Sequence, residues 1–123
     1  MSIYNNLTFT STSEILRIPS DALVYVTADG NYSVMTLADG NDYLLTMQLG
    51  HVERHIAEML SGEDNRFIRI GKSLIVNRQF ITLINPQRQK MVLSDCRTFS
   101  HEVTASKEAL RALKDLLEKE TTT

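Results

Sequence analysis

The sequence predicts a mostly β fold of packed antiparallel sheets, with one central helix and a C-terminal helix. Three observations support this prediction. Short segments that alternate apolar and polar residues recur along the chain, and turns rich in Gly and Asn separate them. Two longer stretches, one central and one terminal, instead have apolar residues at helical spacing. With 123 residues, of which 42% are hydrophobic, the chain is long enough to bury a core as one domain.

The two ends of the chain differ in character from its centre. Residues 1–13 are rich in Ser, Thr and Asn and carry no charged side chain, so we expect a flexible N-terminal leader there. We place the folded domain of the chain at residues 14–118 and a C-terminal tail at residues 119–123. Because no internal repeat or long linker interrupts residues 14–118, we expect a single domain.

The first half of the domain is expected to form a meander of local hairpins. Its strands are expected at residues 14–18, 23–27, 32–37 and 43–47. The sequence Ala-Asp-Gly-Asn occupies both residues 28–31 and residues 38–41. Since Gly and Asn tolerate positive φ, both segments predict tight turns between neighbouring strands.

Each of the two expected helices has one apolar face. The face of the central helix consists of residues at helical spacing: Leu49, Val52, Ile56, Met59 and Leu60. The segment Ser61-Gly62 would end this helix. Ser106 is expected to cap the terminal helix. The apolar stripe of that helix consists of four leucines: Leu110, Leu113, Leu116 and Leu117.

The segment Phe67–Ile84 organises the second half of the domain. Its apolar alternation breaks at Gly71-Lys72-Ser73, residues that a continuous strand would not place in its middle. The backbone is therefore expected to turn there, with buried apolar segments on either side, and to expose the side chain of Lys72. Further strands are expected at residues 81–84, 90–93 and 99–105.

Charge is distributed unevenly along the chain. The window from Asn65 to Ser94 contains six basic residues and no acidic residue. They are Arg66, Arg69, Lys72, Arg78, Arg88 and Lys90. This window carries +6, whereas the remaining residues, with 7 basic and 15 acidic side chains, carry −8. A local run of positive charge favours anionic ligands, of which phosphate is the most common.

The segment F-I-R-I-G-K-S-L-I-V-N resembles the signature F-x-R-x-H-R-S-x-L-V-N of the LytTR family of bacterial DNA-binding domains. The matching residues are Phe67, Arg69, Ser73, Val76 and Asn77. Among the departures, Gly71 stands where the family usually has His, and Lys72 where it often has Arg or another polar donor. The resemblance extends from about Ile18 to Leu117. It implies a LytTR-like fold, in which packed antiparallel sheets carry recognition loops on one edge, and a role in transcription regulation.

The resemblance also implies which side chains read DNA bases. Lys72 takes the position from which the family reaches bases, and lysine can donate to guanine O6 and N7 in the major groove. Ser106-Lys107 resembles the V-x-V-S-R element that precedes the family's terminal helix. Lys107 is therefore expected to contact a base as well.

A third contact is expected from the turn at residues 29–33, which matches another contact loop of the family. Asn31 would pair with a base and Tyr32 with a phosphate. The other candidates for contact with the DNA backbone are polar or basic: Arg69, Ser73, Arg78, Ser106 and Arg111. Each candidate also has a plainer interpretation, as a solvated surface charge, a turn residue or, for Ser106, a helix cap.

Two enzyme-like patterns do not meet the requirements of their motifs. Gly71-Lys72-Ser73 resembles the end of a phosphate-binding P-loop, but residue 66 is Arg where that motif requires Gly. His51 and His55 lie one helical turn apart, but the pair lacks Glu at either motif position between them. We therefore expect no enzymatic activity, no metal and no cofactor.

Nothing in the sequence indicates secretion or membrane insertion. No apolar run approaches the roughly 20 residues of a membrane span, and the N-terminus lacks the pattern of a signal peptide. Cys96 is the single cysteine, so it cannot form an internal disulfide, and a buried or half-buried thiol is expected for it. A cytoplasmic location is therefore expected.

These patterns lead to one interpretation of function and one alternative. The interpretation is a sequence-specific transcription regulator that binds double-stranded DNA and inserts loop side chains into the major groove. A second copy on adjacent repeats, or a separate signalling protein, is a further expected partner. The alternative is a stand-alone protein-interaction module that modulates a partner regulator without binding DNA. It arises because the chain has no room for the receiver domain that family members usually carry.

Overall fold

The computed structural model describes residues 6–60 and 64–121, which form ten strands and two helices. In chain order these are β1 (Asn6–Thr10), β2 (Ile15–Pro19), β3 (Leu23–Asp29), β4 (Tyr32–Leu37), β5 (Asp42–Leu45), α1 (Leu49–Met59), β6 (Phe67–Ile70), β7 (Leu74–Asn77), β8 (Ile81–Asn85), β9 (Lys90–Ser94), β10 (Ser100–Thr104) and α2 (Lys107–Thr121). Short 3-10 turns at Ser20–Ala22 and Arg78–Phe80 lead into β3 and β8. No helix among the described residues is long and apolar enough to span a membrane.

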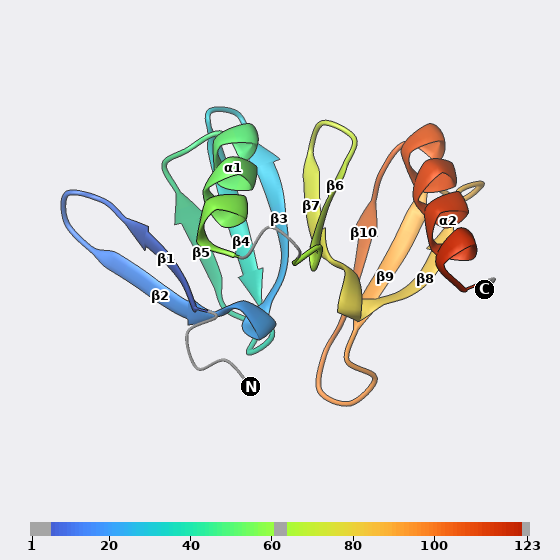
Figure 1. The fold of residues 1–123 in the computed structure, drawn as a ribbon, viewed down its shortest axis with the longest axis horizontal. Coiled ribbons are helices and arrows are strands. Elements are labelled where there is room, and N and C mark those ends of the chain that lie inside the picture. Colours follow the sequence, from blue (N-terminus) through green and yellow to red (C-terminus); the bar gives the residue numbers. More distant parts are fainter. Residues whose placement is uncertain (1–5, 61–63, 122–123) are drawn as a thin grey trace.

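The described strands form three antiparallel sheets (Figure 1). β1 pairs with β2, and β9 lies between β8 and β10 in a second sheet. The third sheet has the order β5-β4-β3-β7-β6, in which the non-consecutive strands β3 and β7 pair through Tyr25–Thr27 and Leu74–Val76. The predicted fold, packed antiparallel sheets with one central and one C-terminal helix, is confirmed.

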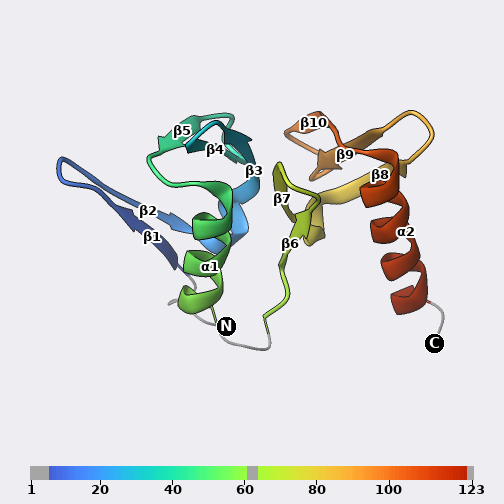
Figure 2. The same cartoon turned by 90° about the horizontal axis from the view of Figure 1, so that it is seen from above.

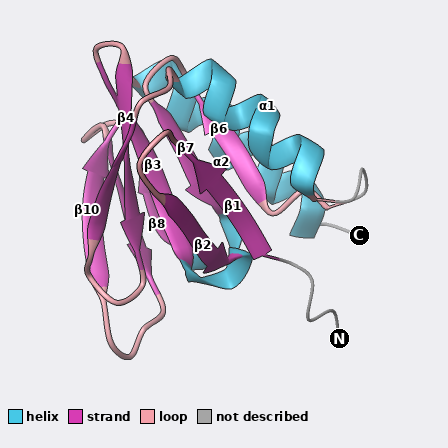
Figure 3. Cartoon of the chain, turned by 90° about the vertical axis from the view of Figure 1, so that its left-hand side faces the viewer, coloured by secondary structure: helices cyan, strands magenta, loops and turns pink. Residues whose placement is uncertain are grey.

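The five-stranded sheet separates two clusters of buried side chains. In β7, Ile75 belongs to one cluster whereas Leu74 and Val76 belong to the other, because successive side chains of a strand point to opposite faces. α1 and the β1–β2 hairpin contribute to the first cluster, and α2 and the β8–β9–β10 sheet to the second. Figure 3 shows both helices on the same side of the stacked sheets.

The buried side chain of Asn77 stabilises the end of β7. Its Nδ2 donates to the carbonyl oxygen of Leu23 at 2.9 Å, and its Oδ1 accepts from the backbone N–H of Gln79 at 3.1 Å. These two hydrogen bonds satisfy the amide nitrogen and oxygen of the Asn77 side chain, which would be costly to bury unpaired. Asn77 thus links two strands of the central sheet and starts the 3-10 turn that follows.

The expected flexible leader is wrong for residues 6–10, which form β1. The side chains of Leu7 and Phe9 are 0% and 4% exposed and belong to the core cluster that α1 covers. His55 of α1 lies with its Nε2 2.9 Å from the carbonyl oxygen of Thr8, within hydrogen-bonding distance. The apolar alternation at residues 7 and 9 therefore describes a strand with one buried face. Residues 1–5 lie outside the described part of the chain.

The expected C-terminal tail is wrong for residues 119–121, because α2 continues to Thr121. Within this last part of the helix, Glu120 Oε1 accepts a hydrogen bond from Arg78 Nη1 at 2.6 Å. Two of the four leucines in the predicted stripe, Leu110 and Leu113, are buried, whereas Leu116 is 41% exposed. The end predicted for the central helix at residues 61–62 lies outside the described residues, and the limits of the domain stay a prediction.

Candidate nucleic-acid interface

The loops named by the sequence motifs lie along one edge of the molecule, which we call the loop edge. It consists of the β3–β4 turn (residues 30–31), the β6–β7 turn (residues 71–73), the segment 105–106, and the first residues of α1 and α2. Figure 1 shows these parts together at its upper end, where both helices begin. Each helix therefore directs the partial positive charge of its N-terminus toward this edge, which favours an anion such as phosphate.

The β6–β7 turn holds Lys72 in place through its backbone and leaves the side chain free. Gly71 has φ +61°, a left-handed conformation that a residue with a Cβ adopts with difficulty. Arg69 donates from Nε to the carbonyl oxygen of Gly71 at 3.0 Å and from Nη2 to that of Lys72 at 3.2 Å. The Lys72 side chain is exposed and forms no ion pair or hydrogen bond with another described residue.

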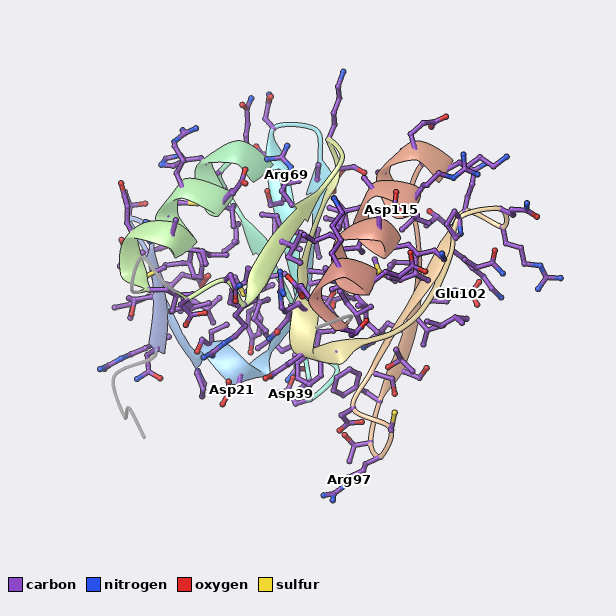
Figure 4. All side chains as sticks on the ribbon, turned by 45° about the vertical axis from the view of Figure 1, so that its right-hand side comes forward. Asp21, Asp39, Arg69, Arg97, Glu102 and Asp115 are labelled. Atoms are coloured by element: carbon purple, nitrogen blue, oxygen red, sulfur yellow. The ribbon has the colours of Figure 1, made fainter. Side chains whose placement is uncertain are left out.

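The guanidinium of Arg69 is bonded to other residues of the protein. Besides the two carbonyl oxygens of the turn, it contacts α1, since its Nη1 lies 2.7 Å from Glu53 Oε1. The side chain of Arg69 is 28% exposed, and its charge is matched by this carboxylate. Figure 4 shows Arg69 in the upper part of the molecule, between the start of α1 and the ribbon of β6. The geometry therefore makes Arg69 a positioning residue for Lys72.

The start of α2 is the second part of the loop edge. The Ser106 hydroxyl accepts the N–H of Ala109 at 3.1 Å, and the Ser106 carbonyl oxygen accepts the N–H of Leu110 at 3.0 Å. The predicted cap is therefore confirmed. Lys107 follows as the first residue of the helix and is exposed, without an ion pair to a described residue.

Arg111 extends the same helical surface. It lies four residues after Lys107, so both side chains are on one face of α2. Arg111 is exposed, and no described carboxylate pairs with it. The turn that carries Lys72 packs beside this helix, since a Cβ added to Gly71 would lie 3.6 Å from Cβ of Ala109. Lys72 and Ser106 both line the groove between β6 and α2.

The β3–β4 turn is attached to the start of α1. Gly30 has φ +63°, and Asn31 Oδ1 accepts a hydrogen bond from Gln48 Nε2 at 3.1 Å. Gln48 immediately precedes α1. Asn31 thus keeps its amide N–H groups available, while its oxygen is engaged. The neighbouring Tyr32 is 48% exposed, which leaves its hydroxyl accessible.

Arg78 does not lie at the loop edge. It begins the 3-10 turn after β7, whereas the Lys72 turn precedes β7, so the two residues are at opposite ends of the same strand. Its guanidinium forms an ion pair with Glu120, and its side chain is 21% exposed. Its Nε is buried without a hydrogen-bond partner among the described residues. This environment fits a residue that attaches α2 to the central sheet.

The basic window of the sequence is largely neutralised in space. Four of its six cations form ion pairs with acids from other segments: Arg66 with Asp21 and Asp64, Arg69 with Glu53, Arg78 with Glu120, and Lys90 with Glu102. Only Lys72 and Arg88 of the window lack an ion pair to a described residue. The cations that are free to meet an external anion on this side of the molecule therefore come from both inside and outside the window.

The sequence interpretation missed the contacts that orient these loops. Gln48 and Glu53 were not singled out, although they hold Asn31 and Arg69. No local pattern marks them, because each is separated from its partner by about sixteen residues of intervening chain. Cys96, for which a buried or half-buried thiol was expected, is exposed in the β9–β10 loop and has φ +62°. No group of three His, Cys, Asp or Glu residues suited to hold a metal occurs among the described residues.

The fold is a mostly β domain whose loop edge brings together three loop segments and two helix N-termini. A family model, described as the LytTr DNA-binding domain, matches residues 13–118. The chain therefore belongs to the LytTR family of DNA-binding domains. No curated protein matches the chain.

A solved structure supports the fold independently. It is described as the LytTr DNA-binding domain of a methyl-accepting/DNA response regulator from Bacillus cereus. The match has a TM-score of 0.61 and 20% sequence identity, and it covers 92% of this chain and 96% of that one. At this level of identity the likeness concerns the fold.

Proposed function

We propose that this protein is a transcription regulator that recognises specific DNA sequences by inserting side chains of the loop edge into the major groove. Membership of a family of DNA-binding domains supports the ligand class. The observation that carries the finer proposal is the β6–β7 turn, in which Arg69 fixes the backbone while Lys72 remains unpaired and exposed. A lysine on a fixed turn can donate to guanine O6 and N7.

The other side chains of the loop edge take complementary roles. Lys107 reads bases beside the start of α2, and Asn31 offers its amide N–H groups to a third base. Tyr32, Ser73 and Arg111 contact phosphates, and Ser106 offers its hydroxyl proton to a phosphate while it caps the helix. Contacts to phosphates set the register of the protein on the duplex, whereas contacts to base edges carry the sequence preference.

Two of the arginines predicted to contact phosphate are better assigned to the fold. Arg69 is bonded to Glu53 and to the turn, and Arg78 is bonded to Glu120 at the far end of β7. Each would have to leave a partner at about 2.7 Å before it could bind DNA. We therefore propose that neither touches the duplex, since Arg69 holds the turn that carries Lys72 and Arg78 attaches α2 to the central sheet.

A selection of bound sequences from random duplex DNA tests the proposal. Enrichment of a defined motif, lost when Lys72→Ala replaces the wild type, is the expected result. A protein-interaction module without DNA binding is the second candidate, favoured by the four neutralised cations of the basic window and the net charge of −2. Failure to retain any duplex at low salt would reject DNA binding and leave this second candidate.

A further inference from the structure

The turn between β8 and β9 is ordered by its own backbone and leaves its longest side chains unused. Asn85 Oδ1 accepts the N–H of Arg88 at 3.1 Å, and the Pro86 carbonyl oxygen accepts the N–H of Gln89 at 3.1 Å. Gln89 has φ +55°, which completes the tight reversal of the chain. The side chains of Gln87, Arg88 and Gln89 are all exposed at the tip.

A backbone hydrogen bond fixes this turn beside the start of α2. The carbonyl oxygen of Gln89 accepts the N–H of Ala105 at 3.3 Å. Ala105 directly precedes Ser106, the cap of the helix that carries Lys107. Figure 2, which views the loop edge from above, shows the β8–β9 turn next to the start of α2, on the side away from the β6–β7 turn. The turn therefore extends the loop edge outward.

Arg88 is the unneutralised charge of this turn. It forms no ion pair with a described residue, whereas the nearby Lys90 lies 3.6 Å from Glu102. An exposed arginine on a fixed turn retains its charge for an external anion, and its guanidinium can bind two oxygens of one phosphate. The adjoining helix N-terminus adds to the positive potential.

We propose that Arg88 binds the sugar–phosphate backbone of DNA outside the groove entered by Lys107, and so lengthens the contacted duplex beyond the three reading loops. This inference rests on the proposed function, because it requires a duplex on the loop edge. Its basis is separate, since it depends on the position and free charge of a turn that the family motif does not include.

Arg97 provides a matched control on the same sheet. Arg88 precedes β9 and Arg97 follows it, so the two arginines lie at opposite ends of one strand. Both are exposed and lack an ion pair to a described residue. Figure 4 shows Arg97 at the lower end of the molecule, far from the loop edge. The two substitutions to Ala therefore remove the same charge from the same sheet and differ in position.

The test compares the affinity of the wild type, Arg88→Ala, Arg88→Lys and Arg97→Ala for a selected duplex and for random duplex. Loss of one phosphate contact should make the slope of log K against log salt less negative by about 0.9. The affinity of the variant relative to the wild type should then be about eightfold lower at 0.1 M salt than at 1 M salt. We expect this loss for Arg88→Ala on both duplexes, partial retention for Arg88→Lys and wild-type behaviour for Arg97→Ala.

Duplex length supplies the positional part of the test. Trimming base pairs from the flank beyond the selected motif should lower wild-type affinity to that of Arg88→Ala and leave the variant unchanged. If Arg88→Ala binds as tightly as Arg97→Ala while the wild type binds DNA, the inference is overturned and the proposed function stands. If the wild type binds no duplex, both are overturned.

Discussion

At the scale of single residues, Lys72 and Arg69 are close in sequence and perform different tasks. Arg69 donates three hydrogen bonds to Glu53, Gly71 and Lys72, whereas the Lys72 ammonium group has no partner among the described residues. A side chain that is already paired holds the structure in place, whereas an unpaired side chain is available to bind a ligand. The two residues can be separated experimentally because sequence preference and salt dependence report on different contacts.

Lys72→Ala should reduce the preference for the selected site over random DNA. A base-edge contact is worth about 1–3 kcal/mol of discrimination, and the exposed lysine contributes little to folding. Affinities for both duplexes at one salt concentration measure the effect, and thermal melts control for folding. Arg78→Ala serves as the comparison and should leave both DNA affinities unchanged. An equal loss on both duplexes by Lys72→Ala would show that Lys72 contacts phosphate alone.

Arg69→Ala should weaken recognition without changing salt dependence. The substitution removes two hydrogen bonds that hold the turn, each worth about 1 kcal/mol, so affinity for the selected site should fall by up to about thirtyfold. The slope of log K against log salt should stay at the wild-type value, because Glu53 already neutralises the guanidinium. A salt titration of both proteins measures this. A slope lowered by about one unit would instead identify Arg69 as a phosphate contact.

At the scale of elements, β1 shows how the burial of two apolar side chains stabilises a strand in an otherwise polar segment. Asn6–Thr10 pairs with β2 along its whole length and places Leu7 and Phe9 against the cluster that includes α1. Thr8, which lies between Leu7 and Phe9, also contacts α1, because its backbone N–H donates to Met59 Sδ at 3.2 Å. A two-stranded hairpin is marginal alone, and this packing is what makes it part of the domain.

Phe9→Ala should therefore destabilise the whole domain. Truncation of a buried Phe costs about 3–5 kcal/mol, because apolar surface is lost and a cavity remains. Urea denaturation of the variant and the wild type measures the free energy of unfolding. Thr12→Ala at the exposed tip of the hairpin is the control and should change that value by less than about 0.5 kcal/mol. A flexible segment at residues 6–10 would make the two variants behave alike.

At the scale of the whole molecule, the net charge of −2 conceals an arrangement in which most cations have partners. Among the cations near the loop edge that lack an ion pair to a described residue are Lys72, Arg88, Lys107 and Arg111. Asp21 and Asp39 lie at the lower end of the molecule in Figure 4, with Arg97. A duplex that approaches the upper end therefore meets the free cations and the helix N-termini before the acids of the lower end.

Binding to duplex DNA should depend on salt in proportion to these free cations. If they displace about four counterions, log K should fall against log salt with a slope of about −3.6. A titration of one duplex at several salt concentrations gives the slope. A value near zero would contradict the electrostatic account, and a value near −5.4 would show that the paired arginines of the basic window also reach phosphates.

Two copies should occupy paired sites spaced by about one helical turn, near 10 bp, on one face of the duplex. This expectation follows from the resemblance to regulators that bind paired short repeats. Moving one site by half a turn should weaken joint occupancy, which a gel-shift assay resolves as separate complexes. Occupancy that does not change with the spacing would favour binding by independent single copies.

Local interactions determined the features of this protein that the sequence predicted well. The turn at Gly30-Asn31, the period of α1 and the cap at Ser106 each depend on residues within a few positions of one another. The cap, for example, joins Ser106 to an N–H only three residues ahead. Such signals are readable from a single chain because the stabilising partner is already present in the same short segment.

Tertiary packing decided which charges are free and which segments are buried. Arg69 meets Glu53 across 16 residues and Arg78 meets Glu120 across 42, so a run that is basic in sequence becomes mostly paired in space. His55 meets the backbone of Thr8 across 47 residues, which helps place β1 against α1. Apart from β1 and the last residues of α2, the sequence by itself determined the strands, helices and turns. The register of the sheets and the packing of the helices determined the partner of each charge. Only those long-range contacts leave Lys72 unpaired at the loop edge.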